Sequence, residues 1–485
     1  MLENELIEIV KTIQKQKCES NYIEIKSAKN GCPKLFDTLS SFSNQEGGGK
    51  IIFGIDENND YEICGVYDPA DLQKKIMEQS LQMEPVVRPL CTVATINNKT
   101  VVSAEIQEIE VFSKPCFYKG VGRIKGSYIR VGDGDRLMTE YEIYSYESFK
   151  KEIHDELRIV SRATIEDIDN DKFLEYMFKI KKNKPNLSAI PIEKIRKLQG
   201  FCENEKPTLA GILLFGDYPQ AYFPQLCITA VVVPGIEKST TGIVGERFID
   251  NMRIDGTIPQ MLENSLNFIR RNMKTKTIID ENTGTRSDKT EYPIIALREL
   301  IINSLVHRDY SIHTDSTPIT ITMYSNRIEI ENPGGLYGRM TLDKLGKISA
   351  DTRNPYIANA LETMEITENR YSGIPTVINS MKNYNLPSPK FENDKGIFKV
   401  TLYNNSTDSF EINNLSSEEQ EILNFCKTPK SRNDISELFK DRLTIAYVME
   451  KYIKKLVDLE LLLLTIPDKP KSKHQKYITK KSSQL

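Results

Sequence analysis

One apolar segment, residues 292–309, restricts the fold of this chain more than any other stretch; it reads YPIIALRELIINSLVHRD. Pro293 stands at a position that tolerates proline, because the first N–H groups of a helix have no acceptor within it. The apolar residues recur at helical spacing and cover a wide stripe, which predicts a mostly buried helix. The rest of its domain must therefore pack around this helix.

Three polar side chains interrupt the apolar stripe. Glu299, Asn303 and His307 recur every fourth residue, so they lie near one helical face. Burying a carboxylate, an amide and an imidazole is costly unless each finds a partner. Two interpretations stay open. One is a satisfied polar seam between two layers, and the other is a nucleotide site in which Asn303 holds Mg²⁺ on the phosphates and Glu299 orients a water molecule.

Two glycine turns follow this helix. Strands are predicted at residues 319–324 and 327–331, with a hairpin turn between them. The second strand runs into Asn-Pro-Gly-Gly at residues 332–335, where glycine allows the backbone to approach a ligand closely. A further turn at residues 368–375, with the sequence ENRYSGIP, leads into another predicted helix.

This order of helix, strands, glycine turns and helix resembles the GHKL ATP-binding fold of gyrase, Hsp90 and histidine kinases. The strings ALRELIINSLVHRDYS, IEIENPGGL, TRNPYIA and SGIP are more closely similar to the GHKL-like module of RecG-related prokaryotic regulators. The resemblance implies an α/β sandwich that binds ATP with Mg²⁺.

By that resemblance Glu299 is the base that orients water and Asn303 is the Mg²⁺ ligand, while residues 332–335 form the turn beside adenine and Gly373 belongs to the phosphate lid. The predicted nucleotide-contacting residues are Glu299, Asn303, His307, Asn332, Gly334, Gly335 and Gly373. Two departures from the family leave ATP hydrolysis open. Glu331 or Asn332 stands where GHKL enzymes carry the aspartate that binds adenine, and Tyr371 replaces the usual second lid glycine.

Length and composition place this module in a larger protein. A chain of 485 residues predicts about three domains, because a single core rarely grows that large. No apolar run is long enough to cross a bilayer, and the first residues, MLENELIEIVK, are unlike a secretory signal. We therefore expect a cytoplasmic protein without a membrane partner.

Cysteine spacing and net charge limit the kinds of metal site, disulfide and nucleic-acid-binding surface that the chain could have. The eight cysteines form no C-x-x-C motif, so neither a zinc cluster nor a disulfide framework is expected. The formal net charge of −3 argues against a uniformly basic coat. Binding to nucleic acid would have to come from local patches.

The N-terminal segment predicts an α+β domain, because short strands and helices are mixed along it. Helices are expected at residues 2–16 and 34–43, and strands at 22–26, 50–55, 92–96, 100–106 and 127–131.

Acidic side chains in this domain could act together. Glu19, Glu24 and Asp56 offer oxygen ligands of the kind that Mg²⁺ or Mn²⁺ prefers, and such ions neutralise the charge that develops on a phosphodiester. Lys26 lies on the same strand face as Glu24 and could stabilise that charge as a fixed cation. The alternatives are a surface ion pair between Glu24 and Lys26, a turn-capping role for Asp56 and a solvated Glu19.

The strings ESNYIEIKSAKN, LSSFSNQEGGGKIIFGIDENN and GSYIRVGDGDR resemble the Schlafen-type AlbA-like domain over about 130 residues. Nuclease members of that family cut structured RNA such as tRNA with two glutamates and one aspartate, which match Glu19, Glu24 and Asp56. The resemblance thus implies a metal site at these residues, with Lys26 beside it. Other relatives are regarded as DNA-binding domains, and the Schlafen zinc cluster has no counterpart here.

The segment between the two modules offers no catalytic constellation and is interpreted as a scaffold. Helices are expected at residues 147–162, 167–181 and 192–197, buried strands at 210–216 and 226–233, a mainly helical stretch at 247–273 and a loop at 274–289.

The C-terminal segment resembles a winged helix-turn-helix domain. Three helices are predicted at residues 416–426, 431–439 and 443–456, and two wing strands at 461–466 and 476–479. Basic and aromatic residues line or flank the third helix or follow it in the tail, and they favour contact with phosphates. They are Tyr447, Lys451, Lys454, Lys455, Lys469, Lys471, Lys473, Lys476, Lys480 and Lys481. The alternative is a protein-interaction module with a solvated tail.

The chain is thus expected to be an α+β multidomain protein. Its predicted parts are a Schlafen AlbA-like domain at 1–150, a connecting α/β scaffold at 151–290, the GHKL-like domain at 291–405, a linker at 406–414 and a winged helix-turn-helix domain at 415–485.

The predicted function is that of an effector in which an ATP-binding module gates cleavage of nucleic acid, RNA such as tRNA in preference to DNA. Prokaryotic defence against phage is the expected setting. The alternative is a non-cleaving, ATP-responsive DNA-binding regulator. A third interpretation is a homo-oligomeric scaffold, because Schlafen-type and GHKL domains both tend to pair, and a homo-oligomer is expected.

Overall fold

The structure is a computed structural model, and its residues fall into two compact units. It describes residues 1–187, 189–241, 245–279, 286–367, 373–394, 396–404, 416–439, 444–458, 461–466, 472 and 475–479. One unit comprises Met1–Val232, Phe248–Met323 and Ile328–Leu402, and the other comprises Val233–Arg247, Tyr324–Arg327 and Tyr403–Leu485.

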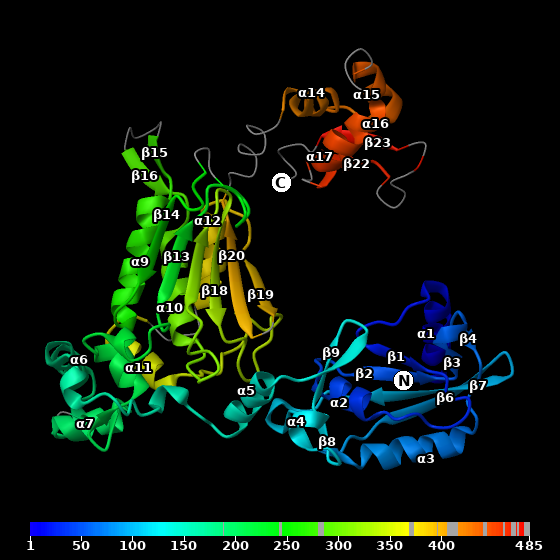
Figure 1. The fold of residues 1–485 in the computed structure, drawn as a ribbon, viewed down its shortest axis with the longest axis horizontal. Coiled ribbons are helices and arrows are strands. Elements are labelled where there is room, and N and C mark those ends of the chain that lie inside the picture. The colour runs from blue at the N-terminus through cyan, green and yellow to red at the C-terminus, as the bar shows by residue number, and fades with distance from the viewer. Residues whose placement is uncertain are drawn as a thin grey trace. The chain divides into compact units, whose positions relative to one another are not determined.

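The N-terminal part of the first unit is built on a four-stranded sheet (Figure 1). Its order is β1 (Ile23–Lys26), β2 (Gly49–Phe53), β7 (Lys99–Ile106) and β6 (Leu90–Ile96). β1 and β2 run parallel, and the other pairs are antiparallel. This arrangement confirms the strands predicted here, with ends that shift by one or two residues.

Helices bury both faces of this sheet, because successive strand residues point to opposite sides. Ile52 packs in the cluster with α1 (Glu3–Gln16), while its neighbour Ile51 packs in the cluster with α2 (Phe36–Asn44) and α3 (Pro69–Ser80). Shorter elements complete this part: β3 (Ile55–Asp56), β4 (Glu62–Ile63), β5 (Met83–Glu84), β8 (Phe117–Tyr118), α4 (Gly122–Gly126), β9 (Tyr128–Val131) and β10 (Gly134–Leu137).

The helix expected at residues 147–162 is placed differently. Helix α5 begins at Glu140 and ends at Lys150, and only a short 3-10 turn, Asp155–Leu157, follows it. Thr139 starts α5 early, because its hydroxyl accepts a hydrogen bond from the Glu142 N–H while the Glu142 carboxylate accepts one from the Thr139 N–H.

The remaining part of the first unit is built on a six-stranded sheet (Figure 1). Its order is β14 (Asp250–Ile254), β13 (Ile228–Val232), β17 (Ile319–Met323), β18 (Arg327–Pro333), β20 (Ile397–Tyr403) and β19 (Lys390–Asp394). β13 pairs in parallel with β17, and β17 pairs antiparallel with β18, which confirms the predicted hairpin.

Three helices form a layer over this sheet (Figure 1). Helix α10 (Ile294–Val306) contacts both α9 (Ile258–Asn272) and α12 (Gly373–Asn383), and α9 also contacts β13 and β14. The prediction of a mostly buried helix at 292–309 is therefore confirmed, and its N-cap is Pro293.

The six-stranded sheet includes strands from the segment that was predicted to be a separate scaffold. It draws β13 and β14 from the segment before residue 290, so the predicted boundary there runs through one sheet. Residues 247–273 contain strand β14 before helix α9, and the loop expected at 274–289 contains the paired strands β15 (Thr275–Ile279) and β16 (Arg286–Thr290). Their sequences, TKTII and RSDKT, show no alternation of apolar and polar residues that would predict a strand.

The strand expected at residues 210–216 is helix α8, Leu209–Phe215. Thr208 caps this helix by accepting a hydrogen bond from the Gly211 N–H. All seven residues are buried, so the helix is apolar on every side and its sequence carries no period that separates it from a buried strand. Helices α6 (Asn170–Asn183) and α7 (Ile192–Leu198) confirm the other predicted scaffold helices, and α11 (Pro355–Thr363) packs against α6 and α8.

The second unit contains a small C-terminal α+β domain. Helices α14 (Ser417–Phe425) and α15 (Arg432–Phe439) precede a longer helix made of α16 (Ile445–Tyr447), a π-helical stretch (Val448–Ile453) and α17 (Lys454–Asp458). Strands β21 (Lys430–Ser431), β23 (Lys476–Thr479) and β22 (Leu462–Leu464) form one sheet in that order. The predicted elements are present, while the winged-helix assignment stays a prediction.

Among the described residues, no helix combines the length and the apolar character needed to cross a membrane.

Candidate functional site

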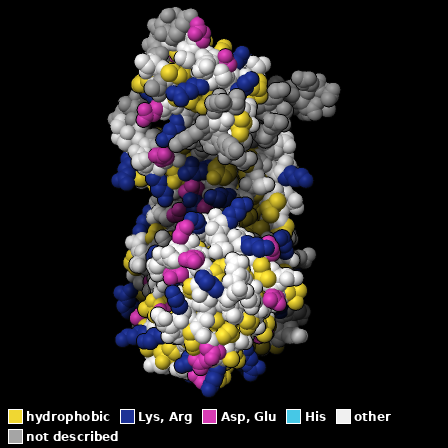
Figure 2. Space-filling view, turned by 90° about the vertical axis from the view of Figure 1, so that its right-hand side faces the viewer, with side chains coloured by type: hydrophobic (Ala, Val, Ile, Leu, Met, Phe, Trp, Pro, Cys, Tyr) yellow, Lys and Arg dark blue, Asp and Glu magenta, His cyan; other side chains and the backbone are white. Residues whose placement is uncertain are grey.

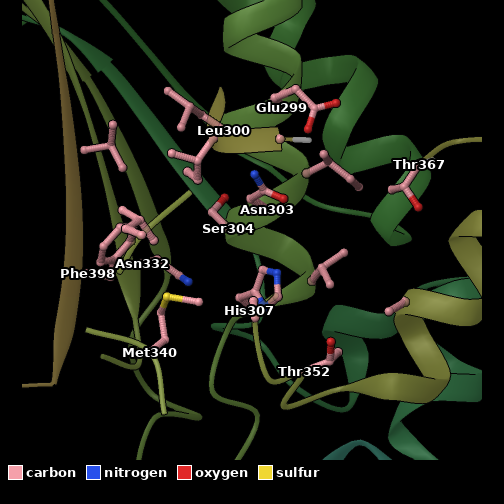
Figure 3. Close-up of a pocket in the computed structure, with 18 of the residues that line it drawn as sticks. Glu299, Leu300, Asn303, Ser304, His307, Asn332, Met340, Thr352, Thr367 and Phe398 are labelled. Atoms are coloured by element: carbon pink, nitrogen blue, oxygen red, sulfur yellow. The ribbon is translucent and has the colours of Figure 1, made fainter. Parts of the chain in front are cut away.

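A cavity of about 500 Å³ lies beside α10, within the size range of small-molecule sites (Figure 3). It is bounded by α10, the end of β18, the segment that follows β18, the start of α12 and β20. The structure brings all the predicted nucleotide-contacting residues to its wall: Glu299, Asn303, His307, Asn332, Gly334, Gly335 and Gly373. Residues that are distant in sequence thus converge on one space.

The polar face of α10 opens into this cavity. Figure 3 shows Glu299, Asn303 and His307 following one another along the helix, and each is only partly buried. On the opposite side, Leu297 and Ile301 are fully buried in the core. This geometry favours the ligand-site interpretation over a sealed polar seam, because a sealed seam has no cavity beside it.

The start of α12 lies directly against two of these side chains. A Cβ atom added at Gly373 would lie 2.9 Å from Glu299 Oε2 and 3.0 Å from Asn303 Nδ2. Only glycine leaves this corner of the cavity open. Residues 368–372 of the predicted lid, Tyr371 included, lie outside the described residues.

Of the two residues that stand where GHKL enzymes carry an aspartate, Asn332 is the one that lines the cavity. Glu331 accepts a hydrogen bond from the Thr320 hydroxyl at 3.1 Å and does not line the cavity. Asn332 does line it; its side chain is buried, with 4% of its surface exposed, and its Oδ1 atom has no hydrogen-bond partner among the described residues. A buried acceptor of this kind is costly unless a ligand or water satisfies it.

Gly334 shapes the turn after β18. Its φ of +106° belongs to a region that residues with a side chain rarely adopt, and an added Cβ would lie 2.7 Å from the Asp309 Cβ. The Gly334 N–H donates to the Gly396 carbonyl at 2.7 Å. Contacts with Asp309 on one side and with the β19–β20 hairpin on the other therefore fix the position of this turn.

His307 is held uncharged beside the cavity. Burial, together with the nearby positive charge of Arg353, lowers its pKa to about 4. A neutral imidazole can donate one hydrogen bond and accept another, but it offers no charge to a phosphate.

A second cluster of charged side chains lies in the N-terminal part. Arg130 on β9 is buried, and its Nη1 lies 2.7 Å from Glu24 Oε2 and 3.0 Å from Asp135 Oδ1. Its Nη2 lies 3.6 Å from Glu19 Oε2, and Lys26 contacts the other Glu24 oxygen. The structure thus brings Glu19, Glu24 and Lys26 together around an arginine.

The Glu19 carboxyl of this cluster has a raised pKa. Burial and the adjacent charge of Glu24 raise its pKa to about 7, against the opposing effect of the Ile25 N–H, which donates to Glu19 Oε1 at 2.7 Å. A carboxyl with such a pKa can exchange a proton near neutral pH.

Asp56 has a different local role. Its carboxylate accepts a hydrogen bond from the Asn58 N–H at 3.1 Å and caps the short 3-10 turn Glu57–Asn59. Within the described part of the chain, no three His, Cys, Asp or Glu side chains are arranged to hold a metal ion. The metal set of Glu19, Glu24 and Asp56 stays a prediction.

Arg130 and Asp135 were not selected from the sequence. Asp135 also accepts hydrogen bonds from the hydroxyls of Thr38 at 2.7 Å and Ser41 at 2.6 Å. The available signal was the arginine inside the predicted strand 127–131, because a charged residue at a buried strand position needs a partner.

Two of the predicted basic residues of the C-terminal domain already have partners. Lys455 forms an ion pair with Glu419 at 2.9 Å, and Lys451 donates to the Tyr447 hydroxyl at 2.5 Å. Lys454 and Lys476 are exposed. On the face drawn in Figure 2, basic and acidic side chains are interspersed. The predicted tail residues Lys469, Lys471, Lys473, Lys480 and Lys481 lie outside the described residues.

Comparison with known families places the chain in the class of nucleic-acid-related proteins with an ATPase-like domain. Residues 19–139 match the family described as "Schlafen, AlbA_2". Residues 316–402 match the family described as "Putative ATP-dependent DNA helicase recG C-terminal". The chain therefore contains a Schlafen AlbA_2 domain and a RecG-type ATPase-like domain. Residues 145–229 match a domain of unknown function.

Two solved structures are similar in part. The DIP2311 protein from Corynebacterium diphtheriae is 16% identical over 89% of this chain and 89% of its own, with a TM-score of 0.40. The N-terminal domain of a putative ATP-dependent DNA helicase RecG-related protein from Nitrosomonas europaea is 23% identical, with a TM-score of 0.23; the match covers 29% of this chain and 97% of that domain. A comparison with curated proteins gives no match.

Proposed function

We propose that this protein binds Mg²⁺–ATP in the cavity beside α10 and that the bound nucleotide controls an N-terminal domain acting on nucleic acid. The observation that carries the proposal is the convergence of all the residues predicted for the nucleotide on one cavity. It is supported by the RecG-type ATPase-like domain at residues 316–402.

In this proposal each residue has a defined role. The Asn303 side-chain oxygen ligates the Mg²⁺ that neutralises the phosphates, and Glu299, one turn earlier on α10, orients a water molecule toward them. Gly373 lets the start of α12 approach the phosphates, because it leaves the space beside Glu299 and Asn303 open. Asn332 meets the base at the other end, and Gly334 and Gly335 allow the backbone to lie against it.

Calorimetric titration of the full chain with ATP and Mg²⁺ tests this site. Asn303→Ala should abolish Mg²⁺-dependent binding, whereas Glu299→Gln should keep binding and remove any hydrolysis. Ser239→Ala, outside the cavity lining, serves as the control. Unchanged affinity in Asn303→Ala would remove the assignment.

We further propose that the N-terminal domain cleaves RNA such as tRNA. The support is the grouping of Glu19, Glu24 and Lys26 around Arg130 within a Schlafen AlbA_2 domain. A carboxyl of raised pKa beside two fixed cations can move a proton and stabilise a phosphate that gains charge. Prokaryotic defence against phage is the setting we propose for such an activity.

The assay combines purified protein with tRNA or duplex DNA, in Mg²⁺, Mn²⁺ or EDTA, with and without ATP. Cleavage that disappears in Glu24→Gln and Glu19→Gln supports the nuclease. The Asp56→Asn variant and the EDTA series decide whether a metal takes part. Uncut RNA under all these conditions would remove the proposal of a nuclease. Light scattering of the same samples tests a separate expectation, that the chain forms a homo-oligomer.

A specific observation favours the alternative of a non-cleaving DNA-binding regulator. Lys26 and Arg130 engage both oxygens of Glu24, which is the arrangement of a structural ion cluster. The C-terminal domain would then bind duplex DNA, with the exposed Lys454 of its third helix contacting the DNA. Salt-sensitive DNA binding that weakens in Lys454→Ala, combined with uncut substrate, would support this function.

A further inference from the structure

Asn332 stands where GHKL enzymes carry a carboxylate beside adenine, and an amide has different chemistry. A carboxylate only accepts hydrogen bonds, so it pairs with the 6-amino group of adenine or with the N1–H of a 6-oxo purine and leaves the neighbouring acceptor, N1 or O6, without a donor. The Asn332 amide carries an acceptor at one end and a donor at the other. It can therefore pair with either kind of purine edge.

The amide of Asn332 is positioned to meet a ligand. It comes from the end of β18 and points into the cavity in Figure 3, near Phe398 and Met340. The side chain is buried, and Oδ1 has no hydrogen-bond partner among the described residues. Because Oδ1 accepts no hydrogen bond from the described residues, the amide can flip by 180° without losing a hydrogen bond at that atom.

The walls around Asn332 do not distinguish one purine from another. Ile330, Met340, Phe398 and Val400 line the cavity with apolar surface, which packs against the faces of any purine ring. His307, held uncharged, adds no charge that favours one base. Discrimination between purines therefore depends on the groups that face the ring edge.

We propose that this cavity accepts 6-amino and 6-oxo purine nucleotides alike, with Asn332 turning its amide to match. For adenine, Oδ1 accepts from the 6-amino group and Nδ2 donates to N1. For a 6-oxo purine, Nδ2 donates to O6 and Oδ1 accepts from the N1–H. Both arrangements form two hydrogen bonds. This inference rests on the proposed nucleotide site and names its ligand class.

The experiment measures competition of ATP, ITP, GTP and CTP against a fluorescent ATP analogue on the full chain with Mg²⁺. ITP tests the 6-oxo group alone, and GTP adds the 2-amino group. In the wild type, ITP should bind within about tenfold of ATP, since the two form equal numbers of hydrogen bonds, and CTP should bind much more weakly. Asn332→Asp should weaken ATP and ITP alike, by about 10- to 100-fold, because a carboxylate cannot donate to N1 of adenine or to O6 of the 6-oxo purine.

The control is Glu331→Gln, which changes a side chain that faces Thr320 outside the cavity and should leave the affinities for both ATP and ITP unchanged. A wild type that prefers ATP over ITP by more than about 100-fold overturns the inference while the ATP site stands. Absence of binding by every nucleotide overturns the proposed site itself. If Asn332→Asp does not fold, the ratio measured on the wild type still decides the question.

Discussion

The phenol of Tyr141 on α5 donates a hydrogen bond of 2.8 Å to Asp309 Oδ2, just beyond the end of α10. Arg353 Nη1 lies 3.2 Å from the same oxygen. Burial alone would raise the pKa of Asp309, but Arg353 and the hydrogen bonds that Asp309 accepts outweigh it and hold that pKa below its usual range. Because Asp309 also packs against Gly334, this pair joins α5 to the turn that borders the cavity.

Loss of this hydrogen bond should destabilise the protein without changing its shape. Tyr141→Phe removes only the hydroxyl and leaves a buried carboxylate with one donor fewer, so we expect a loss of about 1–3 kcal/mol. Urea denaturation at pH 7 measures it. Tyr22→Phe, whose ring is 54% exposed, is the matched control and should lie within about 0.5 kcal/mol of the wild type. Equal stability of both variants would show that the Tyr141–Asp309 pair contributes nothing.

A methyl group at Gly373 should impair nucleotide binding. Gly373→Ala places a Cβ within 3.0 Å of the polar atoms of Glu299 and Asn303, so these side chains must move. We expect ATP affinity to fall by about tenfold or more, the equivalent of about 1.4 kcal/mol. Titration calorimetry measures the change. Gly134→Ala, where an added Cβ meets nothing within 4 Å, should bind ATP as the wild type does.

The Arg130 cluster should be more important for stability than a surface ion pair. Arg130→Met leaves buried carboxylates without their cation, and we expect a loss of about 3–5 kcal/mol in thermal or urea unfolding. Lys11→Met breaks an exposed pair with Glu8 and should cost less than about 1 kcal/mol.

A double-mutant cycle separates the Arg130–Glu24 pair from other effects. If the 2.7 Å contact is the cause, adding Glu24→Gln to Arg130→Met should recover part of the lost stability. Strictly additive losses would place the effect of Arg130 elsewhere, for example in its packing over the Phe42 ring.

His307 should make stability depend on pH in the acid range. Its pKa is about 4 in the folded chain, below the ordinary value near 6.5, so the unfolded chain binds more protons between these two pH values. The stabilising contribution is complete above about pH 6.5 and is lost as the pH falls toward 4. At pH 5 the loss is about 1–2 kcal/mol.

Urea denaturation of wild type and His307→Asn at pH 5 and pH 7.5 tests this sign. The variant should show the smaller difference between the two pH values, because asparagine does not titrate. An identical pH dependence in both proteins would mean that His307 is protonated as easily in the fold as in the unfolded chain.

Local patterns in the sequence predicted much of both modules. The apolar spacing around Leu297 and Ile301 predicted the buried helix, and the Ser325-Asn326 turn predicted the hairpin that the sheet contains. The spacing of Glu299, Asn303 and His307 predicted one polar face, and that face borders the cavity. These signals work because helix and hairpin geometry depend on residues close together in the chain.

Other features depended on contacts between distant segments. Helix α8 is apolar on all sides, so only its packing shows that it is not a strand. The role of Asp56 and the link between Glu19 and Glu24 through Arg130 depend on how β9 packs against α2 and the edge of the first sheet, which no local period encodes.

The sequence by itself determined the buried helix, its polar face and the glycine turns, because spacing and backbone freedom are properties of neighbouring residues. Only the tertiary structure decided that Asn332, and not Glu331, faces the cavity. It also decided that Glu24 contacts Lys26 and Arg130, while the Asp56 carboxylate caps a short turn. In a strand, one residue of difference reverses the side to which a side chain points, and the fold alone decides which side holds the ligand.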